Sequence, residues 1–341
     1  MKRIHWGIVG CGDVTEVKSG PAFQKATGSA LTAVMRRDAA KAADYARRHG
    51  VPKWYSDAAK LIADPQVDAV YVATPPAMHE TYALMVCAAG KPCYVEKPMA
   101  RNTAEAQRMV DAFAVRGLPL FVAYYRRAQP RFVRAKKIIH SGVLGTIKTA
   151  SYAYIDSQMN MRSDPVPWRF LAEQAGGGLL FDLGSHALDL MDFFLGPLGD
   201  VAGEARNIGK QYDVEDSVKL AFTARGKVKG WAELQFNGRR RDDRFKFDGE
   251  NGSLQFSCFG TEPLVLKVYG WRQKSFEFPP LQHVQQPLIQ SIVEALQPGA
   301  HVPDWLSTGA VALRTQRVMD QAVEGYYGGR EDGFWSRPLK K

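Results

Sequence analysis

The chain has 341 residues, a formal net charge of +10 and a hydrophobic fraction of 45%. This length fits one large or two ordinary globular domains, and no apolar run is long enough to span a membrane. The basic residues are dispersed, except for Arg239-Arg240-Arg241. This run follows an Asn237-Gly238 turn signal, so we expect a solvated hairpin tip and no nucleic-acid or membrane partner.

The N-terminus and the cysteines indicate a cytoplasmic protein. The first apolar residues already form a strand that leads into glycines, so no signal peptide is expected. Four cysteines are present and none shares a C-x-x-C spacing, which favours buried reduced thiols. They are Cys11, Cys87, Cys93 and Cys258. No ligand spacing indicates a metal site.

The first part of the chain alternates short apolar strands with helices. We expect strands near 4–9, 31–35, 67–73, 94–95 and 118–123, with helices between them. Strands separated by helices of this length form a parallel sheet that is covered on both faces. Residues 1–124 are therefore predicted to be a doubly wound, Rossmann-type nucleotide-binding domain.

The second part of the chain is richer in strands than the first. Alternating strands are expected near 147–155, 217–223, 228–236, 245–247, 253–257 and 264–269, and an Arg225-Gly226 turn joins the second pair. Helices are expected at 178–195, 288–296 and 308–326. Consecutive strands with tight turns indicate an antiparallel sheet. Residues 125–341 are therefore predicted to be an α+β domain, so the fold class is α/β followed by α+β with a large, mainly antiparallel open sheet.

Gly10-x-Gly12 follows the first strand and precedes a helix that starts at Asp13 and Val14. The first glycine permits a tight turn, and the second allows backbone N–H groups to approach a pyrophosphate. Thr15 stands where a third small residue is usual, so the fingerprint is partial, and an ordinary glycine turn is the alternative. We expect Gly10, Gly12, Asp13 and Val14 to bind a dinucleotide.

The end of the second strand discriminates between dinucleotides. An acidic residue there would bind the ribose 2′-hydroxyl of NAD, whereas this chain has Arg36-Arg37-Asp38. Two guanidinium groups fit the 2′-phosphate of NADP. NADP is therefore predicted over NAD. Two alternatives remain: the arginines are solvated, or Asp38 binds the ribose in a shifted register.

Tyr94-Val95-Glu96-Lys97-Pro98 is an apolar strand that ends in a charged pair and a proline. Ligands bind at the carboxyl ends of parallel strands, so Lys97 should lie beside a pocket, and Pro98 restricts its backbone. The fourth strand ends in Thr74-Pro75-Pro76-x-x-His79. We expect Thr74, Pro75, His79 and Glu96 to line the cofactor site.

A second cluster follows the triple glycine 176–178. In a helix, Asp182, His186 and Asp189 would stand at i, i+4 and i+7 on one face. A histidine held by a carboxylate suits proton transfer near neutral pH. Gly184 would leave room for a ligand or a close backbone. A structural buried His–Asp pair is the alternative.

Together these motifs resemble, in order and spacing, those of the Gfo/Idh/MocA oxidoreductases over nearly the whole chain. The resemblance implies a Rossmann domain followed by a domain whose open sheet mediates a homodimer or homotetramer. It implies that Lys97, Asp182 and His186 surround the reacting carbon and that the Lys97–Pro98 peptide is cis. It also implies that a small substrate contacts Tyr125, Arg126, Trp168, Arg169 and Asp189.

The expected activity is an NADP-dependent interconversion of a secondary alcohol and a carbonyl on a sugar, polyol or similar small molecule. His186 is the expected proton acceptor, and Lys97 would stabilise the developing alkoxide. Lys97 as the base itself remains open. Two alternatives also remain: a glycosidase that uses a tightly bound dinucleotide, and a non-catalytic NADP sensor.

Overall fold

The computed structural model describes residues 1–225 and 227–337. Over this part of the chain the strands form two sheets, and the residues divide into two compact units. The first unit comprises Met1–Ala100, Ala104–Gln129 and Leu281–Leu313; the second comprises Arg101–Thr103, Pro130–Pro280 and Arg314–Lys341. This division differs from the predicted single boundary at residue 124, because the late segment Leu281–Leu313 belongs to the first unit.

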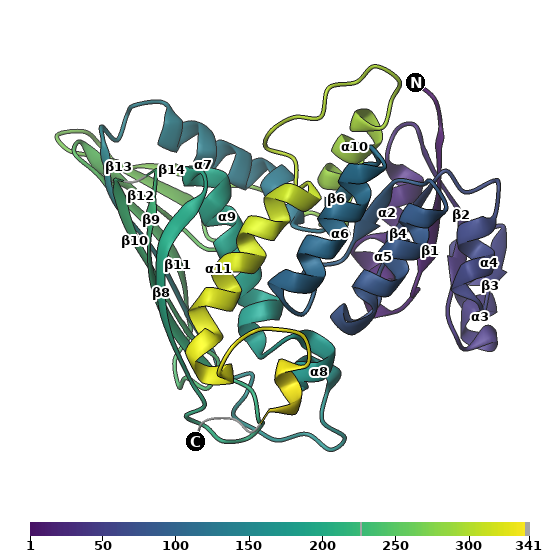
Figure 1. Ribbon diagram of the computed structural model, residues 1–341. Helices are drawn as coiled ribbons and strands as arrows, with labels where there is room; N and C mark the ends of the chain where they lie inside the picture. Colours follow the sequence, from purple (N-terminus) through teal and green to yellow (C-terminus); the bar gives the residue numbers. More distant parts are fainter. Residues whose placement is uncertain (226, 338–341) are drawn as a thin grey trace. The chain divides into compact units, whose positions relative to one another are not determined.

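The first unit has a six-stranded sheet in the order β3-β2-β1-β4-β5-β6, and every pairing is parallel. Its strands are β1 (Ile4–Val9), β2 (Ser29–Met35), β3 (Lys53–Tyr55), β4 (Ala69–Val72), β5 (Cys93–Val95) and β6 (Leu120–Val122). All residues of β4 and β5 are buried, as expected for strands covered on both faces. The predicted doubly wound fold is confirmed (Figure 1).

Helices cover both faces of this sheet with two separate apolar cores. They are α1 (Asp13–Val17), α2 (Gly20–Lys25), α3 (Ala39–His49), α4 (Ala58–Ala63), α5 (His79–Ala88), α6 (Thr103–Val115) and α10 (Gln286–Ala295). Helix α10 comes from the late segment, and its Leu288, Ile289 and Ile292 pack in one core with Phe23 and Tyr71. The late segment therefore completes the first unit's core.

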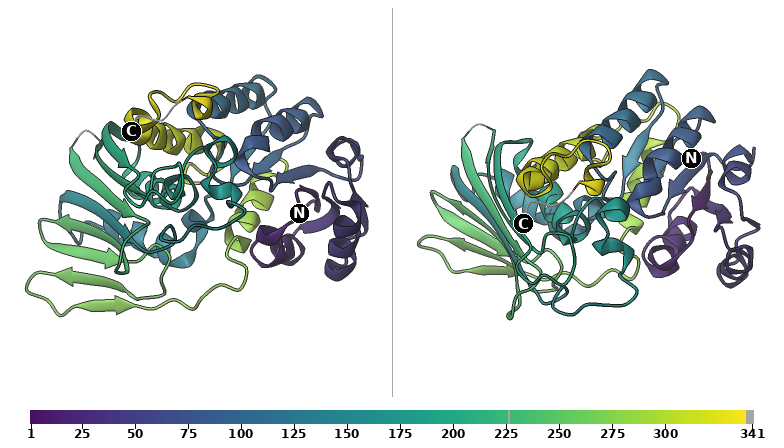
Figure 2. Two further views of the ribbon diagram at one scale, coloured as in Figure 1. Left: turned by 90° about the horizontal axis from the view of Figure 1, so that it is seen from below. Right: turned by 60° about the horizontal axis from the view of Figure 1, so that its bottom comes forward.

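The second unit has an eight-stranded sheet in the order β14-β13-β12-β11-β7-β10-β9-β8 (Figure 2). Its strands are β7 (Ile147–Ile155), β8 (Leu198–Arg206), β9 (Ser217–Ala224), β10 (Val228–Gln235), β11 (Asp242–Gly249), β12 (Gly252–Phe256), β13 (Leu264–Val268) and β14 (Lys274–Phe276). All pairings are antiparallel except β7 with β10. The predicted mainly antiparallel sheet is confirmed.

Helices α7 (Pro130–His140), α9 (Ser185–Leu195) and α11 (Gly309–Tyr327) lie on one face of this sheet (Figure 1). Phe194 of α9 meets Phe245, Phe247 and Phe256 of the sheet nearly edge-on, at ring-centroid distances of 6.1, 5.5 and 5.6 Å. Such edge-to-face pairs add to the stabilisation from buried area. On the other face, Trp231 of β10 is exposed.

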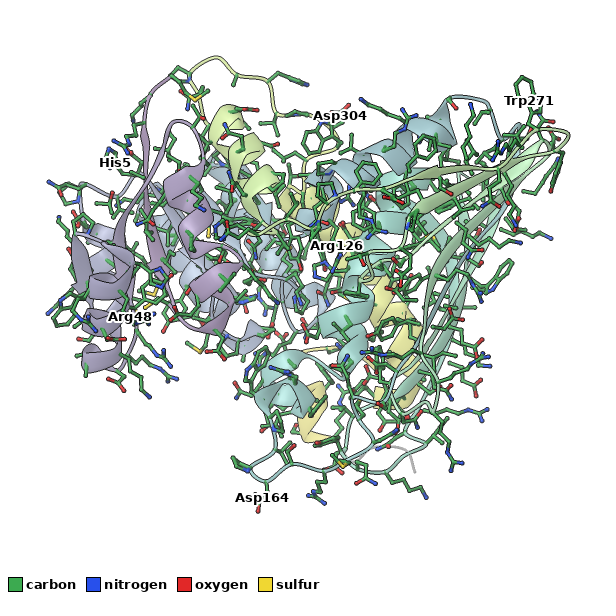
Figure 3. The ribbon with its side chains drawn as sticks, turned by 180° about the vertical axis from the view of Figure 1, so that it is seen from behind. His5, Arg48, Arg126, Asp164, Trp271 and Asp304 are labelled. Carbon is green, nitrogen blue, oxygen red and sulfur yellow. The ribbon has the colours of Figure 1, made fainter. Side chains whose placement is uncertain are left out.

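One local prediction was wrong. Asn237-Gly238 does not close a hairpin, because β10 and β11 are not partners: each pairs with β7, which lies between them. Arg239, Arg240 and Arg241 are exposed, as predicted. Gly226 of the predicted Arg225-Gly226 turn lies outside the described residues, and the flanking β9 and β10 pair antiparallel. A true hairpin, β13–β14, carries the exposed Trp271 at its tip (Figure 3).

The four cysteines are buried thiols outside any disulfide, as predicted. Burial raises the pKa of Cys11 to about 11, so its thiol stays protonated at neutral pH. Among the described residues, no helix is long and apolar enough to cross a membrane, and no group of His, Cys, Asp or Glu side chains could hold a metal ion.

Candidate functional site

The glycine turn closes at the carboxyl end of β1. The N–H groups of Gly10 and Cys11 both donate to the carbonyl of Met35, at 2.9 and 3.0 Å. Gly10 has φ +94°, and a Cβ there would lie 2.8 Å from Cγ2 of Thr74, so only glycine fits. A Cβ on Gly12 would find only one atom within 4 Å, the Gly10 carbonyl oxygen at 3.9 Å. The backbone at Gly12 is therefore open to a close ligand.

Thr15 replaces the usual third small residue without disturbing the turn. It is fully buried, and its hydroxyl donates to the carbonyl of Gly12 at 2.7 Å. Its own carbonyl accepts from the Tyr45 hydroxyl at 2.8 Å. Asp13 is exposed and Val14 half-buried at the start of α1. Local hydrogen bonds thus accommodate Thr15 at the position where the glycine fingerprint usually has a small residue.

Arg36 and Asp38, which follow β2, form hydrogen bonds with different parts of the first unit. The half-buried Arg36 donates from Nη1 to the carbonyl of Cys11 at 3.4 Å, which brings its guanidinium beside the glycine turn. Asp38 caps α3: its carboxylate accepts from the Lys41 backbone N–H at 3.1 Å. Arg37 is exposed. The Asp38 carboxylate is therefore engaged by its own helix.

Thr74 and His79 follow β4, which adjoins β1 in the sheet where the strand order reverses. Within the described chain, the buried Thr74 Oγ1 has no hydrogen-bond partner. Pro75 is half-buried at the start of the next turn. A buried hydroxyl of this kind is an observation that a bound ligand would explain.

His79 is buried between two loops. Its Nε2 lies 2.7 Å from the Thr74 carbonyl oxygen, and its Nδ1 lies 3.0 Å from that of Pro98. Burial lowers the pKa of His79, whereas the facing carbonyl oxygens act in the opposite direction. The polar atoms of His79 thus join the Thr74 loop to the Lys97 loop.

Lys97 follows β5, and its peptide with Pro98 is cis, as the sequence resemblance implied. The Lys97 backbone N–H donates to the Glu96 carboxylate at 3.0 Å. The same buried carboxylate accepts from the Tyr71 hydroxyl at 2.5 Å and from the Gln285 amide at 2.6 Å. Sequence reasoning missed Gln285, which lies 189 residues from Glu96 and stands in no motif.

The Asp182–His186 cluster begins in a π-helical turn, Leu180–Gly184, and continues in α9. The wider π turn replaces the predicted continuous α-helix, so simple i, i+4 stacking does not relate Asp182 to His186. His186 and Asp189 are buried three residues apart on α9, and Asp182 is half-buried. π turns are frequent at functional sites.

Gly184 does not leave room for a ligand. A Cβ there would lie 2.8 Å from Cδ1 of Leu180 and 2.9 Å from Cδ2 of Leu234. The glycine instead lets the helical turn pack closely on β10. Of the two predicted roles of Gly184, room for a ligand or for a close backbone, the structure supports close packing, and the neighbours are the side chains of Leu180 and Leu234.

A buried glutamate accounts for the last residue of the triple glycine. The Gly178 N–H donates to both oxygens of Glu215, at 2.9 Å each, and the Tyr327 hydroxyl donates to Glu215 at 2.5 Å. A Cβ on Gly178 would overlap the Glu215 carbonyl oxygen. Burial raises the pKa of Glu215, and the donors oppose this shift. Glu215 and Tyr327, which sequence reasoning also missed, hold the turn that leads to Asp182.

The remaining predicted substrate residues lie in two short 3-10 turns. Tyr125–Ala128 follows β6 in the first unit, with Tyr125 buried and the Arg126 guanidinium 5.5 Å from its ring. Trp168–Phe170 belongs to the second unit and follows an outer loop that carries Asp164 (Figure 3). Trp168 is 42% exposed and Arg169 is exposed, so Trp168 is not a core tryptophan.

The residues of the first unit fit a dinucleotide. The open backbone at Gly12, the orphaned hydroxyl of Thr74 and the Arg36 guanidinium all lie at the carboxyl ends of β1, β4 and β2. This edge of a doubly wound sheet is where dinucleotides bind.

Comparison with known proteins agrees with this fit. Residues 4–124 match a family model described as "Oxidoreductase family, NAD-binding Rossmann fold", and residues 132–255 match one described as "GFO/IDH/MocA C-terminal domain". Oxidoreductase P35 of Formosa agariphila is 36% identical over 293 residues, covering 85% of this chain and 90% of the relative. A trans-1,2-dihydrobenzene-1,2-diol dehydrogenase of Sus scrofa is 30% identical over 284 residues, covering 81% and 80%.

A solved structure shows the same fold. Levoglucosan dehydrogenase in complex with NADH and levoglucosan superposes with a TM-score of 0.84 at 22% identity, covering 95% of this chain and 97% of that chain. The two family models together span most of the chain, and the predicted family is confirmed. The chain belongs to the Gfo/Idh/MocA family of oxidoreductases.

Proposed function

We propose that this protein is an NADP-dependent oxidoreductase that interconverts a secondary alcohol and a carbonyl on a sugar, polyol or related small molecule. The observation that carries the proposal is the anchoring of Lys97. Its backbone is held by Glu96 on one side, and the following Pro98 carbonyl lies against His79 on the other. Relatives named as levoglucosan and dihydrodiol dehydrogenases support a hydroxyl-bearing carbon as the reaction centre.

NADP, when bound, supplies the hydride acceptor or donor of the reaction. Gly10 and Gly12 with the start of α1, Asp13 and Val14, would hold the pyrophosphate, and Thr74 with its neighbours would line the nicotinamide end. Arg36 supports NADP because its guanidinium is a charged partner for a 2′-phosphate beside the glycine turn. The capping role of Asp38 supports the same choice, since a carboxylate in use there is a poor ribose ligand.

The chain's own groups would move the proton. His186 takes the proton of the substrate hydroxyl, and the Lys97 ammonium donates a hydrogen bond that stabilises negative charge on the substrate oxygen. Asp182 orients the imidazole or the substrate. Reduction follows the same path in reverse. Tyr125, Arg126, Trp168, Arg169 and Asp189 would contact the substrate, and the exposed ring of Trp168 suits stacking on a sugar.

Assembly and location complete the proposal. The exposed face of the eight-stranded sheet carries Trp231 beside Ala221, which is its partner across β9 and β10. We place the contact of a homodimer or homotetramer there, because tryptophan is a typical anchor of protein interfaces. Four buried cysteines outside any disulfide support a reducing compartment, and we assign the protein to the cytoplasm.

The activity is tested with a panel of sugars, polyols and carbonyl compounds that includes levoglucosan, by following absorbance with NADP and NADPH. Lys97→Met and His186→Ala should each lower kcat by roughly a hundredfold or more. Lys91→Met is the matched control, since Lys91 lies just before the same strand and donates to the Asp64 carbonyl at 2.8 Å. Turnover by both test variants within a few-fold of wild type would contradict the proposal, and a loss confined to Lys97→Met would assign the base to Lys97.

A further inference from the structure

The Gln285 side chain lies between two buried groups, one of which needs a hydrogen-bond donor and the other a hydrogen-bond acceptor. Gln285 is fully buried, immediately before α10. Its Nε2 donates to Glu96 at 2.6 Å, and its Oε1 accepts from the Tyr94 hydroxyl at 2.8 Å. A carboxylate only accepts hydrogen bonds, so the amide nitrogen must face Glu96 and the amide oxygen must face Tyr94. A glutamine supplies both groups at this spacing.

The two tyrosines keep this arrangement fixed at any working pH. Burial, with the charge of Glu96, raises the pKa of Tyr71 and of Tyr94 well above the ordinary value. Both hydroxyls therefore remain protonated. Tyr71 donates to the same oxygen of Glu96 that Gln285 contacts, and Tyr94 orients the amide of Gln285.

The segment that carries Gln285 is itself tied to the first unit at several points. The Gln285 backbone N–H donates to the Lys18 carbonyl at 3.2 Å. His283 lies 2.6 Å from the Val17 carbonyl oxygen through Nδ1 and 2.8 Å from the Lys25 ammonium through Nε2. Since an ammonium only donates, the His283 proton is on Nδ1. Gln285 is thus presented by backbone that is anchored just after the glycine turn.

The chain of contacts ends at Lys97. Gln285 and Tyr71 hold one oxygen of Glu96, which leaves the other oxygen to accept the Lys97 backbone N–H at 3.0 Å. We infer that Gln285 is a positioning residue: through Glu96 it fixes the strand end from which the Lys97 ammonium reaches the substrate. The importance of this for turnover rests on the proposed function, but the effect on the Lys97 backbone does not.

The test compares Gln285→Leu with Gln290→Leu. Gln290 belongs to α10, the helix that Gln285 precedes, and it accepts a hydrogen bond from the Thr27 N–H at 2.8 Å. Gln290→Leu therefore removes a hydrogen bond between this segment and the rest of the first unit but leaves the contact with Glu96 intact. Hydrogen exchange of the peptide containing the Lys97 amide is measured by mass spectrometry. We expect this amide to exchange about tenfold faster in Gln285→Leu and at the wild-type rate in Gln290→Leu.

A second readout is kcat with the panel compound that the wild type turns over fastest. Gln285→Leu should lower kcat about tenfold and change the KM for NADP less than about threefold, because the Gln285 side chain contacts Glu96 and Tyr94 and none of the residues proposed to hold the pyrophosphate. Equal exchange in the two glutamine variants would overturn the inference. If Gln285→Leu does not fold, Tyr94→Phe removes one hydroxyl, keeps the ring, and should speed exchange in the same direction; no change would overturn the inference.

Lys97→Met separates the two proposals. It keeps the backbone N–H and should retain the protection of that amide while losing turnover. Undiminished turnover in Lys97→Met would contradict the proposed role of the Lys97 ammonium and leave the exchange result of Gln285→Leu to decide the positioning role.

Discussion

Arg36 is the residue on which the proposed preference for NADP rests. It stands at the end of β2, where a carboxylate would bind the ribose of NAD, and its guanidinium reaches back to the glycine turn. Asp38, the nearest acidic residue in sequence, is used as a helix cap. The two side chains therefore support the proposed choice of NADP for independent reasons.

Arg36→Asp should reverse this preference. Removing charge-assisted bonds to a 2′-phosphate and adding a repelling carboxylate should lower kcat/KM for NADPH by roughly a hundredfold, with NADH affected little. Arg47→Asp makes the same charge change on α3 at an exposed side chain paired with Asp44, and should leave the ratio near that of the wild type. An NADPH/NADH ratio unchanged by Arg36→Asp would rule out the role of Arg36.

At the scale of elements, the triple-glycine turn shows that tertiary packing can require a glycine at a given position. Gly176 has φ +90°, and Gly178 lies against the backbone of Glu215 while its N–H donates to the Glu215 carboxylate. The last glycine of a run that resembles a ligand loop in the sequence is thus required by its contacts with Glu215 of the same unit. It lies just before the π-helical turn Leu180–Gly184.

Gly178→Ala should destabilise the fold by about 2–4 kcal/mol, because the added methyl overlaps the backbone carbonyl oxygen of Glu215 and the backbone must shift to accommodate it. Gly325→Ala is the matched control. Gly325 lies in α11, where no neighbouring side chain or loop of residues 1–225 and 227–337 comes within 4 Å of an added Cβ, so the change should stabilise by about 0.5–1 kcal/mol. Urea unfolding measures both, and a Gly178→Ala midpoint equal to that of Gly325→Ala would contradict this account.

Local sequence patterns predicted the strands and helices well, but they did not predict contacts between residues that are far apart in the sequence. The strand–glycine–helix order and the apolar run before Lys97 are encoded within a few residues, and the parallel sheet follows from them. Gln285 and Glu215 are not encoded in this way, because each acts on residues far along the chain and neither falls in a periodic pattern. The failure at Asn237-Gly238 has the same origin: a local turn signal cannot tell that β7 lies between β10 and β11.

On the scale of the whole molecule, the chain returns to its first unit after building its second sheet. Leu281–Leu313 is part of the first unit, where α10 fills one core and Gln285 reaches Glu96. The N-terminal residues alone therefore do not complete the nucleotide-binding unit. This arrangement makes the end of β5 dependent on a segment that is synthesised late.

The open face of the second sheet is where assembly is expected, and Trp231 provides its test. A charge in place of a central interface aromatic loses buried area and leaves a carboxylate without solvent, so Trp231→Glu should weaken self-association at least about tenfold. Sedimentation velocity over a range of concentrations measures the change. Trp54→Glu is the control, because Trp54 of β3 has the same 47% exposure but belongs to the first unit. If exposed tryptophans merely promote nonspecific association, both variants will dissociate alike; if the sheet face is the interface, only Trp231→Glu will shift toward the monomer.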